Sequence, residues 1–247
     1  MKDKTILVTA ASRGLGYAVA QTLVQEKARV VICGRTEDSL TQAVSKLGER
    51  AEYVVADVSK QDDIKKLVEA IEKKNSKLDG LFINAGGPPS GTFSSVSDED
   101  WRKSFNLTLM SAIWLTREAL PLLKESESPS ILYSTSISVK QPINNLLLSN
   151  SIRPAVIGMM RTLASEIGPD GVRVNAVCPG YFYTARVEQI LGSDKSVLES
   201  LEADIPLGRL GKPNEFGATC AFLLCPLASY IHGTLMLIDG GLYRGMM

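Results

Sequence analysis

Residues 5–20 read TILVTAASRGLGYAVA, and this stretch decides the fold. A short apolar run ends at Thr9, two glycines follow at Gly14 and Gly16, and a helical segment begins immediately afterwards. Glycines at such a turn let the backbone approach a pyrophosphate closely. The helix that follows directs free N–H groups and the positive end of its dipole towards the same place. The stretch therefore favours a dinucleotide-binding turn over a purely structural one.

The rest of the chain repeats this alternation of short apolar runs and amphipathic segments. Strands that are apolar on both faces are typical of a parallel sheet between two layers of helices, whose ligand site lies at the carboxyl ends of the strands. We predict a single dinucleotide-binding domain over residues 1–247, of the α/β class, with a Rossmann-like doubly wound sheet of seven parallel strands. The predicted strands are 5–9, 29–33, 52–55, 80–84, 130–134, 172–177 and 234–238, and the predicted helices are 15–27, 37–47, 61–74, 98–124, 151–167 and 213–226.

The composition excludes several classes of function. The 27 basic side chains balance 27 acidic ones, so no basic field favours nucleic acid or an anionic membrane. No apolar run approaches the roughly 18 residues of a membrane span, and the run near the N-terminus is too short for a signal peptide, so we expect a cytoplasmic protein. The single histidine, His232, and four scattered cysteines argue against a metal site and against a Ser-His-Asp hydrolase.

Several ordered motifs resemble the short-chain dehydrogenase/reductase family, and the likeness runs from Lys4 to Leu242. The family's loop, Thr-Gly-x-x-x-Gly-x-Gly, is matched except that Ala10 replaces the first glycine. The branch that the chain most resembles is that of the 3-oxoacyl-carrier-protein reductases. The further matching motifs are Asp57-Val58, Asn84-Ala85-Gly86, Asn106 within Phe105-Asn106-Leu107, Pro179-Gly180 with Thr184, and Asp239-Gly240-Gly241.

The resemblance implies a nicotinamide cofactor, and two arginines indicate which one. NAD-selective relatives place an aspartate after the second strand, where this chain has Arg35. Together with Arg13, this side chain offers two guanidinium groups to a 2′-phosphate, so we expect NADP(H) rather than NAD(H). Two solvated surface arginines are the alternative. The implied cofactor-binding residues are Thr9, Ser12, Arg13, Gly14, Leu15, Gly16, Arg35, Asp57, Val58, Asn84, Ala85, Gly86, Arg153, Pro179, Gly180 and Thr184.

The catalytic pattern of the family is incomplete in this chain. Ser136 and Asn106 take the places of the family's serine and asparagine, but Ser149 and Arg153 stand where the family has tyrosine and lysine. A serine hydroxyl is a far weaker acid than a phenol, and an arginine stays protonated and cannot join a proton relay. The predicted catalytic residues are Ser136, Asn106, Ser149 and Arg153.

Pro154 offers a plainer interpretation of the same segment. Proline costs a helix little only within its first turn, so Ser149, Asn150 or Ser151 is expected to cap the helix. In that case Ser149 is an N-cap instead of a catalyst, and Arg153 is an ordinary helix residue in a salt bridge. Tyr181, Tyr183 and Lys140 are other candidates near the mouth of the pocket.

We therefore expect an NADP(H)-dependent oxidoreductase that reduces a carbonyl compound or a conjugated enone by hydride transfer. The substrate pocket is expected at Gly87, Tyr181, Phe182 and Tyr183, beneath a flap at about 181–210 that includes the apolar residues Val187, Ile190 and Leu191. These residues suit a small-molecule substrate that is an apolar carbonyl compound. The alternative is a catalytically weak or inactive NADP(H)-binding sensor or scaffold, and lyase, epimerase or dehydratase chemistry is a third option. The resemblance also implies a homotetramer or a homodimer.

Overall fold

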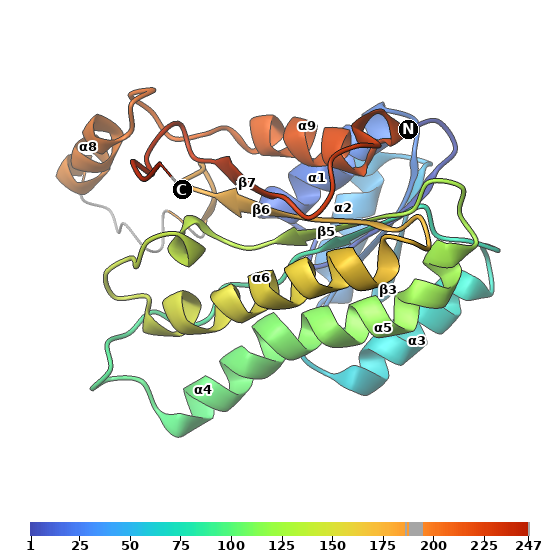
Figure 1. The fold of residues 1–247 in the computed structure, drawn as a ribbon, viewed down its shortest axis with the longest axis horizontal. Coiled ribbons are helices and arrows are strands. Elements are labelled where there is room, and N and C mark those ends of the chain that lie inside the picture. The colour runs from blue at the N-terminus through green and yellow to red at the C-terminus, as the bar shows by residue number, and fades with distance from the viewer. Residues whose placement is uncertain (186, 188–194, 247) are drawn as a thin grey trace.

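The computed structural model describes residues 1–185, 187 and 195–246, and within them the chain forms a seven-stranded parallel sheet (Figure 1). The strand order is β3-β2-β1-β4-β5-β6-β7, with every neighbouring pair parallel. The sequence prediction of a doubly wound sheet is confirmed. The strands are β1 (Thr5–Val8), β2 (Arg29–Gly34), β3 (Ala51–Val55), β4 (Gly80–Ile83), β5 (Ser130–Ser134), β6 (Arg173–Pro179) and β7 (Leu235–Ile238).

Helices cover both faces of this sheet (Figure 1). On one face lie α1 (Gly14–Gln25), α2 (Glu37–Leu47) and α9 (Pro213–Leu224), and on the other lie α3 (Gln61–Glu72), α5 (Ser111–Lys124) and α6 (Leu147–Ile167). Helix α4 (Asp98–Phe105) runs into α5 through a π-helical turn, η1 (Asn106–Met110). The remaining elements are α8 (Lys195–Asp204) and the 3₁₀ turns η2 (Ile137–Val139) and η3 (Pro226–Ala228).

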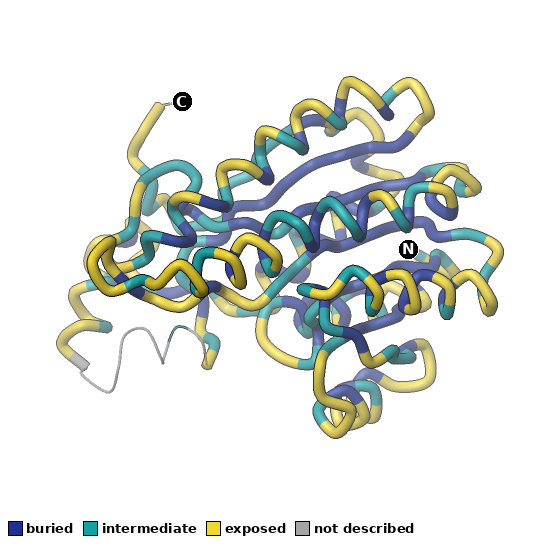
Figure 2. Tube along the Cα trace, turned by 90° about the horizontal axis from the view of Figure 1, so that it is seen from below, coloured by how far each residue is buried: buried dark blue, intermediate teal, exposed yellow. Residues whose placement is uncertain are grey.

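The core consists of two apolar layers, one on each face of the sheet. Strands β1, β4 and β6 are buried along their whole length, whereas the outer surfaces of the helices are exposed (Figure 2). Side chains of a strand alternate between the faces, so Ile6 and Val8 pack towards α1 and α9 while Leu7 packs towards α3 and α5. Apolar burial on both sides explains why these strands are apolar at nearly every position.

Strand order reverses between β1 and β4, because the chain first builds the sheet outward from β1 to β3 and then returns to β1's other side. Loops that follow two adjacent strands diverge at such a point and leave a crevice at the carboxyl ends. Thr9 and Asn84 lie there. The fold thus places the loop after β1 beside the end of β4.

Three features differ from the sequence prediction. The segment 98–124 is helical throughout but contains the π-helical turn η1. Helix α6 begins at Leu147, four residues before the predicted start at 151. Helix α8 was not expected, because its residues fall in the stretch interpreted as a flap. None of the described helices is both long enough and apolar enough to cross a membrane.

Candidate active site

A hydroxyl–backbone pair joins the two strand ends at the point of reversal. The Thr9 hydroxyl donates a hydrogen bond to the backbone oxygen of Asn84 at 2.7 Å and accepts one from the Asn84 backbone N–H at 2.8 Å. The Asn84 amide group donates in turn to the Ala10 carbonyl oxygen at 3.3 Å. Thr9 and Asn84 therefore fix the distance between the loops after β1 and β4. The Thr9 hydroxyl and the Asn84 amide N–H are occupied by these bonds.

The loop after β1 leaves space beside its backbone. Gly14 has φ +63°, and a Cβ atom built there meets nothing within 4 Å. Gly16 is packed tightly instead, since a Cβ would lie 2.6 Å from the Ala10 carbonyl oxygen. The N-cap residue of α1, Arg13, makes no side-chain cap, so no side chain satisfies the first N–H groups of the helix. Free N–H groups beside an open backbone suit a pyrophosphate.

Ala10 takes the unusual conformation expected of the glycine that it replaces. Its φ is +49°, in the left-handed region that favours glycine. An alanine pays a steric penalty there because its Cβ approaches the following carbonyl oxygen. The loop therefore keeps a left-handed conformation at position 10 although an alanine stands there.

Arg13 and Arg35 lie in the loops that follow the adjacent strands β1 and β2. The Ala11 N–H donates to the Cys33 carbonyl oxygen at 3.1 Å, and Ser12 lies against Gly34, so the loops after β1 and β2 are in contact. Both arginines are exposed, and neither has a hydrogen-bond or ion-pair partner among the described residues. Two available guanidinium groups and no acid at the end of β2 fit a 2′-phosphate.

The other expected cofactor-binding residues line the same edge of the sheet. After β3, Asp57 accepts hydrogen bonds from the backbone N–H and hydroxyl of Ser59 at 3.0 and 2.8 Å, and Val58 is buried. After β4, Gly86 has no atom within 4 Å of a Cβ position, which leaves backbone accessible beside Ala85. Leu15 packs against the core of the α1 face.

One hydrogen-bonded network joins Arg153, Ser149, Ser138 and the backbone of Thr135. Arg153 Nε donates to Ser149 Oγ at 3.1 Å, and Arg153 Nη1 donates to the Thr135 carbonyl oxygen at 2.9 Å. Ser149 Oγ lies 3.0 Å from Ser138 Oγ, and both hydroxyls are buried. Arg153 thus ties α6 to the end of β5.

Ser136 has a different environment from these buried hydroxyls. Its Oγ accepts a hydrogen bond from the backbone N–H of Ser138 at 3.1 Å, and it is only partly buried. Within the described chain no group accepts the hydroxyl hydrogen of Ser136. This hydroxyl is therefore oriented by the start of η2 and has its proton available for a substrate oxygen.

The expectation that Ser149, Asn150 or Ser151 caps the helix is wrong. Helix α6 begins at Leu147, its N-cap residue is Leu146, and no side chain caps it. Asn150 instead holds the preceding loop, accepting from Ile143 N–H at 3.1 Å and donating to the Ile143 oxygen at 2.9 Å. Pro154 consequently lies inside the helix and leaves the Asn150 backbone oxygen without the usual helical donor.

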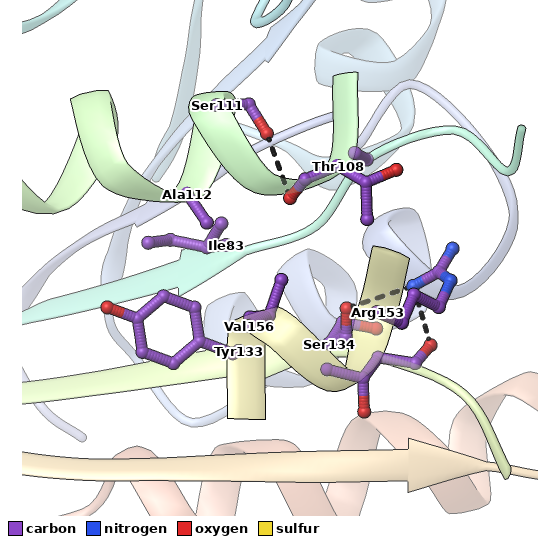
Figure 3. A pocket seen from close by; sticks show the side chains of 10 residues that line it. Ile83, Thr108, Ser111, Ala112, Tyr133, Ser134, Arg153 and Val156 are labelled. Carbon is purple, nitrogen blue, oxygen red and sulfur yellow. Dashed lines mark hydrogen bonds between the residues drawn. The ribbon is translucent and has the colours of Figure 1, made fainter. Parts of the chain in front are cut away.

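A cavity of about 10 Å³ lies between β4, β5, η1 and α6, roughly the space of one water molecule (Figure 3). Arg153 and Thr108 are among its lining residues, and the hydroxyl of Thr108 has no hydrogen-bond partner within the described chain. Asn106 does not line this cavity and is exposed, with a backbone oxygen that accepts from Ser111 N–H. The sequence analysis indicated Asn106 but missed Thr108 and Ser138. The only feature that could have pointed to them is their position, since Thr108 lies two residues after Asn106 and Ser138 two residues after Ser136.

The three aromatic residues after β6 have different environments, and none of them lines the cavity described above. Tyr181 is partly buried, and burial raises its pKa. Tyr183 is half exposed and donates to Glu202 at 2.5 Å. Phe182, expected in the pocket wall, packs in the core instead, because its ring contacts that of Phe216 at 5.5 Å between centroids.

The remaining residues of this segment are only partly described. Pro179 is buried, and the Gly180 N–H donates to the Ile238 oxygen at 2.9 Å, which joins the segment to β7. The backbone oxygen of Thr184 accepts from Val187 N–H at 2.9 Å. Ile190 and Leu191, expected in the flap, lie outside the described residues.

The single histidine is occupied by backbone contacts far from Ser136. His232 Nδ1 accepts from Val174 N–H at 3.1 Å, and its Nε2 lies 2.7 Å from the Ala164 oxygen. Across the described ranges, His, Cys, Asp and Glu side chains form no group of three that could hold a metal ion.

Comparisons with known proteins identify relatives along nearly the whole chain. The family model described as enoyl-(acyl carrier protein) reductase matches residues 9–243. A chloroplastic tropinone reductase homologue of Arabidopsis thaliana is 34% identical, over 98% of this chain and 76% of its own. Human dehydrogenase/reductase SDR family member 4 is 31% identical, over 98% of this chain and 88% of its own.

Solved structures agree with these matches. One is an NADPH-bound short-chain oxidoreductase of Pseudomonas aeruginosa described as containing an atypical catalytic centre. It is 30% identical to this chain, with a TM-score of 0.92, over 99% of this chain and all of that one.

Proposed function

Since the chain belongs to the short-chain dehydrogenase/reductase family, we propose that it is an NADP(H)-dependent reductase of a ketone or a conjugated enone. One observation carries the cofactor half of this proposal. The open loop at Gly14 stands beside two arginines without partners in the described chain, at the ends of β1 and β2. An aspartate at Arg35 would repel the 2′-phosphate that these arginines attract.

The cofactor would lie along the carboxyl edge of the sheet. The loop 10–16 would hold the pyrophosphate, Arg13 and Arg35 the 2′-phosphate, and Asp57 with Val58 the adenine ring. Residues 84–86 and 179–184 would flank the nicotinamide. NADPH, when bound, supplies a hydride to the substrate. The protein's own residues must then orient the substrate and stabilise the charge that develops on its oxygen.

Ser136 is the group that we assign to the substrate oxygen. Its hydroxyl accepts from Ser138 N–H and keeps its own hydrogen for donation. A hydrogen bond to a carbonyl oxygen strengthens as negative charge develops there, which favours the transition state over the ground state. The contact to Ser138 fixes the direction of this donor in advance.

Ser149 and Arg153 act as positioning residues in this account. Arg153 holds the Thr135 carbonyl oxygen and so fixes the backbone that leads to Ser136. Ser149 is buried and occupied by Ser138 and Arg153, so its hydroxyl does not take over the role of a phenol at the substrate. Water is then the source of the proton. For an enone, the carbanion formed by hydride addition is protonated in a later step.

The second candidate function is a non-catalytic NADP(H)-binding protein. The observation that favours it is the same burial of Ser149. Among the four predicted catalytic residues, this burial leaves only the hydroxyl of Ser136 to act on a substrate. Oxidation of NADPH by a panel of ketones, quinones and enones, with the fluorescence of bound NADPH recorded in parallel, separates the two. Turnover of any member supports the reductase, and binding without oxidation throughout the panel supports the sensor.

Assembly into a homotetramer or homodimer belongs to the same proposal. Leu227 and Tyr230, beside the end of α9, are 83% and 102% exposed, which is unusual for large apolar side chains. A closed symmetric assembly would cover them. Gel filtration of the protein at micromolar concentration tests this, and a monomer would reject it. The cytoplasmic location remains a prediction, since one relative is described as chloroplastic.

A further inference from the structure

We propose that the substrate of this site is an oxo acid, a carbonyl compound with an apolar body and a carboxylate, and that Lys140 binds the carboxylate. This inference rests on the proposed reductase function and specifies its substrate class. Lys140 lies four residues after Ser136, at the C-cap of η2. A ligand that reaches both would have its carbonyl oxygen at Ser136 and its acid at the mouth of the pocket.

The charges around the pocket carry the argument. The two segments that meet there, 84–97 after β4 and 134–152 after β5, contain one ionisable side chain in total, Lys140. They are joined by hydrogen bonds from Gly91 N–H to the Asn145 oxygen at 2.8 Å and from Leu147 N–H to the Gly91 oxygen at 3.3 Å. Residues 179–185 after β6 carry no charge. Arg153 directly follows the second segment, so it and Lys140 make this region positive, and neither segment supplies an acid. This charge favours an anionic group on the ligand.

The acid that follows β7 is already occupied. Asp239, at the end of β7, accepts hydrogen bonds from the backbone N–H groups of Gly241 and Tyr243 at 3.0 and 2.8 Å. Lys140 forms no ion pair with any described residue. Its charge is therefore compensated by solvent or by a ligand and not by the protein.

Lys140 is held in place and not left to extend freely into solvent. Its ammonium nitrogen lies 5.8 Å from the centroid of the Tyr243 ring, within the range of a cation–π contact. The C-terminal segment that carries Tyr243 ends beside the arrowheads of β6 and β7, at the carboxyl edge of the sheet (Figure 1). A half-buried lysine positioned by an aromatic ring loses less side-chain freedom on binding an anion than a solvated one.

The charge of Lys140 also acts on a buried thiol at the strand ends. The pKa of Cys178, in β6, is raised by burial, and the charges of Lys140 and Arg153 both act to lower it. Cys178 Sγ lies 3.1 Å from the Thr135 hydroxyl, one residue before Ser136. Both cations thus contribute a positive potential at the end of β5 and β6, where the substrate oxygen is assigned.

The experiment compares matched pairs of compounds on the full-length protein loaded with NADPH. Each pair is a straight-chain oxo acid and its methyl ester of the same length, which differ in charge and not in the carbonyl. The variants are Lys140→Met, Lys140→Arg, and Lys46→Met as a control on the exposed side of α2. We expect the wild type to prefer the acid, and Lys140→Met to raise the KM for the acid about tenfold, with kcat and the ester unchanged. Lys140→Arg should retain the preference.

Equilibrium binding of the same pairs to the NADP⁺-loaded protein, by calorimetry, provides a readout that needs no turnover. Tighter binding of acid than ester, lost in Lys140→Met, supports the carboxylate site even if no compound oxidises NADPH, a result that would overturn only the reductase function. Equal binding of acid and ester by the wild type would overturn the inference. An equal loss for both compounds in Lys140→Met would also overturn it, because it would show that Lys140 only holds the C-terminal segment.

Discussion

At the scale of single residues, Arg153 makes the contact that connects α6 with β5. Its side chain donates to Ser149 and to the Thr135 carbonyl oxygen, so one guanidinium group joins α6 to the end of β5. The planar fork of arginine can make several such bonds at once, whereas an ammonium group is a compact point charge. Arg153 therefore makes a structural contact that uses two of its donors.

Substitution Arg153→Met tests this contact. It removes charge-assisted hydrogen bonds to a partly buried backbone, so we expect the free energy of unfolding to fall by about 2–3 kcal/mol. Chemical denaturation of Arg153→Met, Arg153→Lys and the wild type measures the difference. The Arg153→Lys variant should recover only part of the lost free energy of unfolding, because an ammonium group cannot make both bonds in the same geometry. Full recovery would contradict the claim that Nε and Nη1 of Arg153 both contribute.

Substitution Ser136→Ala tests the donor to the substrate oxygen. Loss of one preorganised hydrogen bond at a developing oxyanion typically costs about 100-fold in rate, so kcat should fall by that order while the Kd of NADPH stays unchanged. Steady-state kinetics and NADPH fluorescence give the two quantities. Ser138→Ala is the matched control, because it keeps the backbone N–H that orients Ser136 and removes only a buried hydroxyl. Unchanged turnover in Ser136→Ala would reject the assignment.

At the scale of elements, the bounds of regular helices and strands could be predicted from the sequence, whereas the start of α6 could not. The bounds of α2 and β5 match the predicted 37–47 and 130–134, because each combines a clear periodicity with flanking polar residues. Helix α6 was misplaced since its true start, after Leu146, has no capping side chain. The three polar residues 149–151 imitate a cap and belong to the helix interior, where tertiary contacts to Ser138 and Ile143 satisfy two of them.

The site could be predicted from the sequence in part for the same reason. The glycines of the β1–α1 loop and Ser136 occur at fixed distances from strands that are easy to recognise. The direction of a side chain depends on packing between distant segments. Phe182 is buried against Phe216, and Thr108 rather than Asn106 lines the cavity, and neither fact is encoded in local spacing.

Pro154→Ala tests how α6 accommodates its proline. Alanine restores the N–H that the Asn150 backbone oxygen lacks and is a better helix former, so the protein should gain about 1–3 kcal/mol of stability. Thermal unfolding monitored by circular dichroism measures the change. Pro154 is exposed, so no packing is lost. A decrease in stability would show that the proline is needed to shape the helix.

Ala10→Gly tests the strain in the loop after β1. The left-handed conformation costs an alanine about 1–2 kcal/mol, and glycine loses about 0.4–1 kcal/mol more conformational entropy on folding, so a net gain of up to about 1 kcal/mol is expected. Thermal unfolding again measures it, with Ala11→Gly as the control in an ordinary conformation. A loss of stability in both variants alike would contradict the strain.

At the scale of the whole molecule, the chain has one sheet and no separate substrate domain among its described residues, so cofactor and substrate must share the carboxyl edge. The balance of 27 basic and 27 acidic side chains conceals an uneven distribution. Arg13, Arg35, Lys140 and Arg153 all lie at this edge, whereas the acids Asp57 and Asp239 at the same edge accept hydrogen bonds from neighbouring protein groups. The edge is therefore suited to an anionic cofactor, and in our account to an anionic substrate as well.

Arg35→Ala tests the choice of cofactor. The loss of one charge-assisted bond to a phosphate should weaken NADPH binding about tenfold and leave NADH nearly unaffected. Fluorescence titration with both nucleotides measures the ratio. Arg50→Ala, an exposed arginine paired with Asp3 on the opposite edge, is the matched control. Equal weakening of both nucleotides would show that Arg35 does not recognise the 2′-phosphate.

The most direct test of the central claim is the consumption of NADPH by a catalytic amount of the wild-type protein in the presence of the ketone and enone panel. Our account predicts more than one equivalent of NADPH oxidised per protein with at least one compound, at a rate at least tenfold that with NADH. Tight binding of NADPH with no oxidation by any member of the panel would contradict it.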